Sequence, residues 1–266
     1  MEYIFSSTGI DCLKSQLQRT NLFALDFDGT LAQINPFPDA ARMRPSTEAL
    51  LAQLARREAV VIVSGRGLQD LKRRVSVPNI KLIGNHGIES DVRNYSLALA
   101  SAEKICHAWK RDLLSILIDS ASGLAIDIED KIYSLSVHYR RSTNYSLCLD
   151  FIARAVSLLV PSPRVIHGKA VVNLVPPGSP HKGDAVVDAL THSGLAHGIF
   201  VGDDDTDEDV FLNSRADLFT IRVGFDPNSA ASFYLRGQQE IERLLSLFLQ
   251  ARLERAGGHR VTDKTK

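Results

Sequence analysis

The sequence predicts an α/β protein in which a smaller α+β domain is inserted into a doubly wound, Rossmann-like parallel sheet. Short apolar segments recur at 22–25, 60–63, 81–84 and 198–201, a pattern typical of strands that are buried on both faces. Helical segments separate them, so the strands are expected to run parallel. Between about residues 90 and 176 the order changes to helix, strand, strand, helix, strand, strand, which indicates a separate domain with an antiparallel sheet.

The first apolar strand ends in two carboxylates, within the segment LFALDFDGTL (22–31). Asp26 and Asp28 therefore lie at the carboxyl end of a strand, where open α/β sheets bind ligands. Burying both acids costs free energy unless a cation or a proton neutralises them, and oxygen ligands suit Mg²⁺. Gly29 and Thr30 add N–H groups and a hydroxyl for an anion. An Asp-x-Asp pair can also serve as a turn or cap, so the spacing alone leaves both interpretations open.

Polar residues also follow the next two strands. A helix that opens at Pro45 leads to the strand 60–63, and a helix through Leu68 and Leu71 leads to the third strand. Because the carboxyl ends of parallel strands meet at one edge of a sheet, the residues after them are candidates for the same site. They are Ser64, Gly65 and Arg66 after the second strand, and Asn85, His86 and Glu89 after the third.

The inserted domain begins with a long helix, expected at 97–119, in which Ile105, Trp109 and Leu113 recur every four residues. Its other elements are expected as a strand at 124–128, a turn with Glu129 and Asp130, a strand at 131–139, a helix at 145–159, and strands near 164–166 and 171–175.

The strand at 131–139 alternates between apolar and polar side chains, so one face is expected to pack under the helices. The opposite face either covers a cleft or meets solvent, and the alternation does not decide between the two. Its side chains are those of Ser134, Ser136, His138 and Arg140.

After the proline-rich segment 175–181 the chain returns to the first domain. Lys182 begins a helix, and the strand 198–201 then ends in the acidic run GDDDTDED (202–209). A charge run is usually a solvated loop, but this one directly follows a buried strand. We therefore expect it beside the first two aspartates, with Asp203, Asp204 and Asp207 as candidate metal ligands.

These patterns divide the chain into a core, an inserted cap and a tail. The core comprises residues 1–89 and 177–254, and the cap comprises residues 90–176. A strand at 218–223 and an amphipathic helix complete the core. Residues 255–266 are polar and contain glycine, so they are expected to form a flexible tail.

Composition restricts the class of partner. Thirty-one basic residues balance thirty-one acidic ones, so no net charge favours nucleic acid or an anionic membrane surface. Cys12, Cys106 and Cys148 lack the spacing of metal ligands and fit a reducing compartment. The first residues lack the pattern of a secretory signal, and no segment has the apolar length that spans a bilayer. We therefore expect a cytoplasmic monomer that acts on a small molecule.

The polar groups resemble, in order and spacing, the four motifs of the haloacid dehalogenase-like phosphohydrolases, with a cap of the C2 type. Within that superfamily the chain resembles the trehalose-6-phosphate phosphatase family. The segments that carry the resemblance are LDFDGTLA (25–32), VSGR (63–66), GNHGIE (84–89), EDKIYSLSVHYR (129–140), HKGDA (181–185) and GDDDTDEDVF (202–211).

The residue types and the resemblance together imply phosphoryl transfer with Mg²⁺ as cofactor. Asp26 is expected to attack phosphorus and form an aspartyl-phosphate, while Asp28 protonates the leaving oxygen and then deprotonates water. Asp26, the backbone carbonyl of Asp28 and Asp203 are expected to bind the metal, with Asp207 or Asp204 beside it. The phosphate oxygens are assigned to Ser64, Gly65, Lys182 and the groups of Gly29 and Thr30.

The resemblance implies hydrolysis of trehalose 6-phosphate to trehalose and phosphate, the final step of trehalose biosynthesis. In the strand before the third motif, Asn173 stands where related sequences commonly have glutamate, so an amide replaces a charged group. The residues assigned to the sugar phosphate are Arg66, Asn85, His86 and Glu89 of the core, and Glu129, Lys131, His138, Arg140 and Asn173 of the cap.

Asn173 keeps a second substrate class open, another phosphorylated glycoside such as glucosylglycerol phosphate or mannosyl-3-phosphoglycerate. A phosphotransferase is a further alternative, because the sequence does not reveal how well a cap excludes water. A non-catalytic sensor of sugar phosphates is disfavoured, since such a protein is expected to lack Asp26 or Asp28, and both are present.

Overall fold

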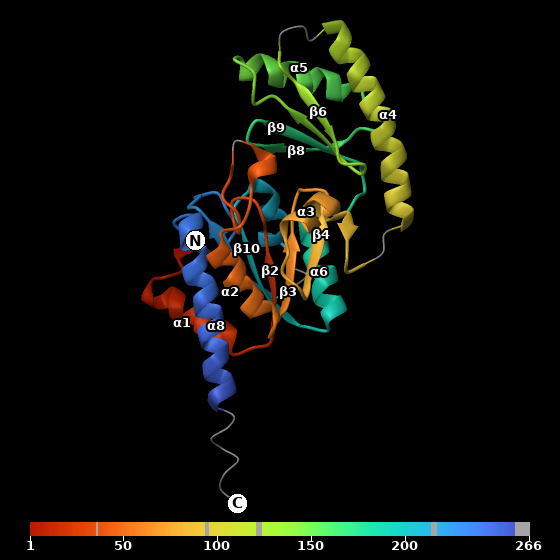
Figure 1. Cartoon of the computed structure of the whole chain (residues 1–266). Helices are drawn as coiled ribbons and strands as arrows, with labels where there is room; N and C mark the ends of the chain where they lie inside the picture. Colours follow the sequence, from red (N-terminus) through yellow and green to blue (C-terminus); the bar gives the residue numbers. More distant parts are fainter. Residues whose placement is uncertain (36, 94–95, 121–123, 214–216, 259–266) are drawn as a thin grey trace, which may run out of the picture.

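The computed structural model describes residues 1–35, 37–93, 96–120, 124–213 and 217–258. Within them two β-sheets organise the chain, one in the core and one in the cap, and the cap lies above one edge of the core sheet (Figure 1). The predicted fold class, a doubly wound α/β core with an inserted α+β cap, is confirmed.

The core sheet of the described residues is almost entirely parallel. Its strands are β1 (Glu2–Tyr3), β2 (Asn21–Leu25), β3 (Ala59–Val63), β4 (Ile80–Gly84), β5 (Glu89–Ser90), β10 (His197–Gly202), β11 (Asp217–Val223) and β12 (Phe233–Leu235). Their spatial order is β1-β12-β11-β10-β2-β3-β4-β5, and the antiparallel pair is β4 with β5.

The strand order reverses between β2 and β10. From β2 the chain proceeds through β3 and β4 to one edge, and from β10 it proceeds through β11 and β12 to the other. Leu25 pairs with Val201, and the Asp26 N–H donates to the carbonyl of Val201 at 2.9 Å. Open α/β sheets bind ligands at such a switch point, so the topology brings the two acidic strand ends together there.

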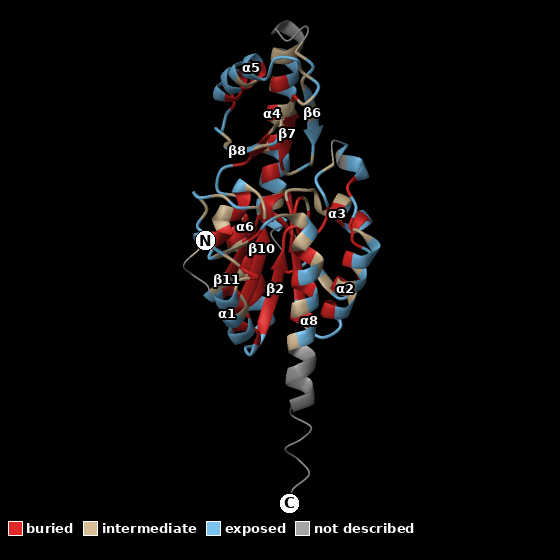
Figure 2. Ribbon diagram, turned by 90° about the vertical axis from the view of Figure 1, so that its left-hand side faces the viewer, coloured by how far each residue is buried: buried red, intermediate tan, exposed pale blue. Residues whose placement is uncertain are grey.

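Helices cover both faces of the core sheet. Phe23 and Leu25 of β2 face one layer, and Leu22 and Ala24 face the other, as expected for alternating strand residues. The buried strands lie between the helices in Figure 2. The first layer contains α1 (Ser7–Leu17), α2 (Pro45–Ala55), α3 (Leu68–Arg74) and α8 (Ile241–Gly258), and the second contains α6 (Lys182–Ser193) and α7 (Glu208–Phe211).

Short 3-10 helices connect several of these elements. These helices are η1 (Pro38–Ala40), η2 (Asn85–Gly87), η3 (Asp205–Asp207) and η4 (Gln238–Glu240). The second, η2, follows β4 and the third, η3, follows β10, so both lie near the carboxyl edge of the sheet and carry predicted site residues.

The cap follows the predicted order of helix, strand, strand, helix, strand, strand. Its elements are α4 (Ser96–Ser120), β6 (Asp127–Asp130), β7 (Leu135–His138), α5 (Tyr145–Ser157), β8 (Arg164–Gly168) and β9 (Val171–Val175). The strands pair antiparallel in the order β6-β7-β9-β8. Trp109 of α4 and Ile152 of α5 pack with Leu135 of β7, so both helices cover one face of this sheet.

The structure corrects the predicted turn between the first two cap strands. Glu129 and Asp130 lie inside β6, and residues 131–134 form the turn instead. The reason is the register of the ladder, in which Ile128 pairs with Val137 and both face the helices. Glu129 then pairs with Ser136, which places the carboxylate on the opposite face of the cap sheet.

Three short strands escaped prediction. Strands β1, β5 and β12 have two or three residues, too few to show a period. Helix α8 continues to Gly258, into the segment 255–266 that was predicted as a tail, and residues 259–266 lie outside the described part. The flexibility of this tail stays a prediction. No described helix is both long and apolar enough to cross a membrane. The extent of the cap, residues 90–176, stays a prediction.

Candidate active site

A cleft of about 220 Å³ lies between the carboxyl edge of the core sheet and the open face of the cap sheet. The polar face of β7 therefore covers a cleft, which answers the question that its alternation left open. The predicted residues that line the cleft are Asp26, Asp28, Ser64, Gly65, Arg66, His86, Glu129, Lys131, His138, Arg140, Asn173, Lys182, Asp203 and Asp204.

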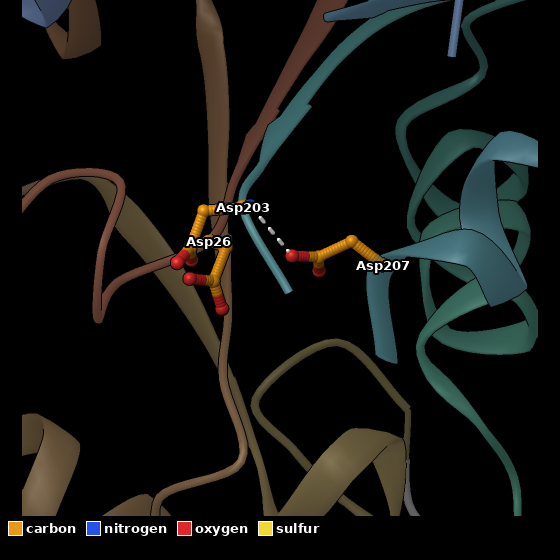
Figure 3. Close-up of side chains that lie close together, drawn as sticks. All are labelled: Asp26, Asp203 and Asp207. Carbon is orange, nitrogen blue, oxygen red and sulfur yellow. Dashed lines mark hydrogen bonds between the residues drawn. The ribbon is translucent and has the colours of Figure 1, made fainter. Parts of the chain in front are cut away.

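Three carboxylates converge beneath the cleft, those of Asp26, Asp203 and Asp207 (Figure 3). Each offers an oxygen, and these oxygens lie within 4.8 Å of one another. The Lys182 ammonium, at the first turn of α6, donates to Asp26 Oδ1 and to Asp207 Oδ1, both at 2.8 Å. Residues 156 positions apart in the chain thus form a buried ion pair.

The crowded carboxylates perturb one another. Burial raises the pKa of Asp26 well above its usual range, and the charges of Asp207 and Asp203 add to this against the opposing charge of Lys182. Burial, together with Asp207 and Asp204, raises the pKa of Asp203 to about 7. Burial opposes the charged form of Lys182, but Asp207 and Asp26 outweigh it and raise its pKa. Three carboxylates thus surround one ammonium, and their full ionisation is opposed unless a further cation is present.

This cluster fits a hard divalent cation. Asp203 Oδ1 is buried without a hydrogen-bond partner among the described residues, although a buried carboxylate oxygen normally has one. Gly29, at φ +86°, allows the carboxylate to approach closely, because a Cβ there would lie 2.0 Å from Asp203 Oδ2. A cation bound by Asp26 and Asp203 would supply the missing partner and relieve the repulsion.

Backbone and side-chain contacts hold the acidic loop in shape. Asp207 Oδ2 accepts hydrogen bonds from the N–H groups of Asp203 and Asp204, at 2.9 and 3.0 Å. Arg222 of β11 donates to the Asp204 carbonyl at 3.3 Å and to Glu208 at 2.9 Å. The Asp204 carboxylate accepts from the Asp205 N–H, so it caps η3 and lies outside the group of three converging carboxylates.

Arg66 holds the second aspartate of the first motif. Its Nε and Nη2 donate to Asp28 Oδ2 and Oδ1, at 2.6 and 2.8 Å, in a bidentate pair. Its Nη1 donates to Asp70 of α3 at 2.8 Å, and Arg74 donates to both oxygens of Asp70, at 2.7 and 2.9 Å. An alternating chain of carboxylates and guanidinium groups thus leads from the helix to the cleft.

Ser64 and His86 present polar atoms beside this pair. Ser64 is 1% exposed, and its Oγ accepts from the Arg66 N–H at 3.2 Å, which leaves its proton for another acceptor. His86 is buried, and neither ring nitrogen has a partner in the described chain. Burial lowers the pKa of His86 well below its usual range, and the nearby charges of Lys131 and Lys182 add to the effect. A neutral imidazole at the cleft wall can therefore donate and accept hydrogen bonds.

The cap contributes a second polar wall. Glu129 accepts from His138 at 2.8 Å, and this hydrogen bond, against the effect of burial, lowers the pKa of Glu129. Ser136 donates to Asn173 Oδ1 at 2.6 Å. The Lys131 ammonium donates to the Gly65 carbonyl at 3.1 Å, and burial lowers its pKa.

Five predicted site residues do not line the cleft: Gly29, Thr30, Asn85, Glu89 and Asp207, of which Asp207 lies in the group of three converging carboxylates. The Gly29 N–H donates to the Ala32 carbonyl at 2.7 Å, so the turn itself uses the predicted phosphate donor. Thr30 is fully buried, and its hydroxyl has no partner in the described chain. Asn85 and Glu89 lie behind the wall and bind each other at 2.7 Å.

Other lining residues were missed by sequence reasoning. Asp70 lies four residues after Arg66 and four before Arg74, a spacing that predicts ion pairs on a helix. Lys169 lies in the turn between β8 and β9. A lone lysine in a turn is usually a surface residue, so the sequence does not mark it as part of a site. Arg140 donates to the carbonyls of Asn35 and Lys169, so it joins a core loop to that turn.

A family model and the curated relatives point to the same family. A model of the trehalose-phosphatase family matches residues 24–237. A probable trehalose-phosphate phosphatase from Sinorhizobium fredii is 32% identical over 221 residues, which cover 81% of this chain and 82% of that protein. A trehalose-phosphate phosphatase from Mycobacterium bovis is 33% identical over 195 residues, which cover 70% of this chain and 49% of that protein. The chain thus spans about half the length of the mycobacterial relatives.

Solved structures share the architecture. A trehalose-6-phosphate phosphatase related protein aligns with a TM-score of 0.72 at 22% identity, over 88% of this chain and 100% of that one. The C-terminal domain of a Candida albicans trehalose-6-phosphate phosphatase aligns with a TM-score of 0.69 at 20% identity, over 90% of this chain and 96% of that one. At these identities the likeness shows the fold. Because the family match extends across both the core and the cap, this chain belongs to the trehalose-phosphatase family.

Proposed function

We propose that the protein hydrolyses trehalose 6-phosphate to trehalose and phosphate with Mg²⁺ as cofactor, the final step of trehalose biosynthesis. One observation carries the proposal. A single cleft joins a carboxylate and lysine cluster suited to phosphoryl transfer with a cap wall of hydroxyl-binding groups. The family match and the relatives' names support this choice of substrate.

Asp26 is the proposed nucleophile. Lys182 binds its Oδ1 at 2.8 Å, which orients the carboxylate at the base of the cleft. Attack on phosphorus forms the bond from Asp26 to phosphorus and breaks the bond to the sugar oxygen, giving an aspartyl-phosphate. Lys182 and the hydroxyl of Ser64 then stabilise the charge on the phosphate oxygens.

Asp28 is the proposed acid and base. It protonates the departing sugar oxygen, and it later accepts a proton from the water that hydrolyses the aspartyl-phosphate. Arg66 binds both of its oxygens, and a guanidinium group only donates. The Asp28 oxygen that carries the proton therefore has to turn away from Arg66 during the reaction.

Mg²⁺ would be held by Asp26, Asp203 and the backbone carbonyl of Asp28, with Asp207 or Asp204 beside it. When bound, it neutralises charge so that an anionic carboxylate can approach an anionic phosphate. The unpartnered Oδ1 of Asp203 and the raised pKa of this group support the assignment.

The cap is proposed to recognise the sugar. Glu129 and Lys131 lie on the wall that faces the phosphate site, and both bear groups that bind hydroxyls. Asn173 is turned toward Ser136, which donates to its Oδ1, so the amide has one lone pair fewer for a ligand. This contact keeps another phosphorylated glycoside as the second candidate substrate.

A substrate panel tests the proposal. Phosphate release would be measured with Mg²⁺ or with a chelator, on trehalose 6-phosphate, glucose 6-phosphate, sucrose 6-phosphate, glucosylglycerol phosphate and mannosyl-3-phosphoglycerate. We expect Mg²⁺-dependent release with a clear preference for trehalose 6-phosphate. Preference for another glycoside would move the substrate assignment to the cap contacts, and no release from any ester would reject the phosphatase.

A further inference from the structure

Asn85 occupies the junction of core and cap without facing the cleft. It begins η2, directly after β4, and its side chain is fully buried. Its Nδ2 donates to Glu89 Oε2 at 2.7 Å and to the Lys131 carbonyl at 3.0 Å, while its Oδ1 accepts from the Ser134 hydroxyl at 2.5 Å. Both amide hydrogens are therefore used within the protein, and none is left for a substrate.

On the cap side, Asn85 binds both ends of one turn. Residues 131–134 are closed by a hydrogen bond from the Lys131 N–H to the Ser134 carbonyl at 3.0 Å. Asn85 contacts the carbonyl of the first residue and the hydroxyl of the last. The Lys131 side chain leaves this turn to line the cleft, where it reaches Gly65. The position of Lys131 thus depends on how the turn is seated.

On the core side, the same region holds the catalytic segment 64–66 by three successive carbonyls. The Ser64 carbonyl accepts from the His86 N–H at 3.0 Å, and the Arg66 carbonyl accepts from the Asn85 N–H at 2.7 Å. The Gly65 carbonyl accepts from the Lys131 ammonium at 3.1 Å. Two of these donors belong to η2, and the third comes from the turn that Asn85 seats.

Glu89 anchors this arrangement. Its Oε2 accepts from the Asn85 amide and also from the Leu68 N–H at 2.9 Å, at the first residue of α3. A carboxylate at a helix N-terminus is stabilised by the unpaired N–H groups there. Asn85 is therefore held from the core while it binds the cap.

We propose that Asn85 is a positioning residue that seats the cap turn 131–134 on the core, so that Lys131 and the segment 64–66 face one substrate together. For the identity of that substrate the proposal rests on the proposed function. A phosphate ester too small to reach the cap needs only the core segment. A disaccharide phosphate needs both the core segment 64–66 and Lys131 of the cap. Asn85 therefore affects the turnover of a disaccharide phosphate, and it does so through the position of Lys131.

The test combines two substrates with a mutant cycle. Asn85→Ala and Ser134→Ala would be made alone and in a Lys131→Ala background, and kcat and KM measured with trehalose 6-phosphate and with p-nitrophenyl phosphate. Ser134→Ala removes a single hydroxyl from the cap side, so it also serves if Asn85→Ala folds poorly. Asn79→Ala is the matched control, because Asn79 is an exposed asparagine with φ +64°, close to the φ +51° of Asn85.

We expect kcat/KM for trehalose 6-phosphate to fall by about tenfold in Ser134→Ala, the factor that corresponds to the loss of one hydrogen bond. The fall should be larger in Asn85→Ala, which loses more than one. The small ester should change by less than about threefold, and so should trehalose 6-phosphate when Lys131 is already alanine. Losses that are equal on both esters, or that persist in full in the Lys131→Ala background, would overturn the proposal.

A second measurement does not depend on activity. Amide hydrogen exchange of residues 131–134 should be faster in Asn85→Ala and Ser134→Ala than in the wild type, and unchanged in Asn79→Ala. If the wild type does not hydrolyse trehalose 6-phosphate, the proposed function fails, and the exchange result still decides the positioning role. Unchanged exchange in both variants would refute it.

Discussion

Lys182 is the residue on which the charge balance of the site depends. It is 2% exposed, and its ammonium bridges Asp26 and Asp207. A buried ion pair contributes little in net terms, because desolvation offsets the attraction, yet removing one partner leaves an uncompensated charge. Lys182 therefore stabilises the folded protein in the absence of metal by compensating part of the charge of the acidic cluster.

For Lys182→Ala we expect the free energy of unfolding without metal to fall by roughly 3–5 kcal/mol, the cost of breaking a buried pair. Mg²⁺ should restore part of this stability, because a ligand that binds only the folded carboxylates, as we propose for Mg²⁺, stabilises the folded state. Urea denaturation with and without Mg²⁺ measures both effects. Lys81→Ala, which changes an exposed lysine of β4, is the control and should stay within about 0.5 kcal/mol of wild type. Equal stability of the two variants would contradict this account.

Asp26→Asn should abolish phosphate release while the protein stays folded. The amide keeps the shape of the carboxylate but removes both the proposed nucleophile and a proposed metal ligand, and it lowers the repulsion within a cluster where Asp26 is 4% exposed. Phosphate release and thermal unfolding check the two parts of this prediction. A variant that retained most of its activity would exclude Asp26 as the nucleophile.

At the scale of elements, α3 orients the side chain that holds Asp28. Asp70 accepts from Arg66 four residues before it and from Arg74 four residues after it. Burial opposes the charged form of Asp70, but the hydrogen bonds from Arg74 and Arg66 outweigh it and lower its pKa. A seven-residue helix thus stabilises a guanidinium group at the edge of the cleft.

Asp70→Asn should lower the free energy of unfolding by about 2 kcal/mol at pH 7, since two charge-assisted contacts are weakened. Because the folded pKa of Asp70 is lowered, its stabilisation is complete above its unfolded pKa of about 4 and is lost as the pH falls through the folded value. The difference between variant and wild type should therefore shrink below about pH 4. Denaturation curves at pH 7 and pH 3 measure this difference. A difference that grew on acidification would contradict a lowered pKa of Asp70 in the folded protein.

At the scale of the whole molecule, the cleft is completed only when the cap meets the core. Contacts cross between them at Asn85 with the 131–134 turn, at Lys131 with Gly65, and at Arg140 with Asn35. One wall carries the carboxylate and lysine cluster to which we assign the phosphate, and the other carries polar groups of the cap. The proposed substrate, which has both a sugar and a phosphate, would contact both walls.

Glu129→Ala should greatly reduce turnover of trehalose 6-phosphate, by at least about tenfold, and affect p-nitrophenyl phosphate much less. Glu129 lines the cleft from the cap and accepts from His138, so its loss removes the proposed sugar contact without changing a side chain of the core. Steady-state kinetics on both esters make the comparison, with Glu103→Ala, an exposed glutamate of α4, as control. Equal losses on the two esters would show that Glu129 does not read the sugar.

Local patterns determined the elements of this protein. Apolar runs such as 60–63 identified buried strands, and the alternation in 131–139 identified the helix-facing side of the cap sheet, because burial acts on each segment separately. Asp26 and the acidic run 202–209 each directly follow a predicted strand. Because parallel strands have their carboxyl ends at the same edge of a sheet, the sequence predicted that the two lie side by side. Two- and three-residue strands, and the register that places Glu129 within β6, gave no such signal.

Only the tertiary structure decided which polar groups pair. Asp28 and Arg66 are 38 positions apart, and Asn85 and Lys131 are 46 apart, so no local period connects them. The sequence named Asn85 and Glu89 as ligand residues, whereas the fold directs them to each other and to the cap turn. Hydrogen bonds are short-ranged and directional, so the partner of a buried polar group depends on how whole elements pack and not on its neighbours in the chain.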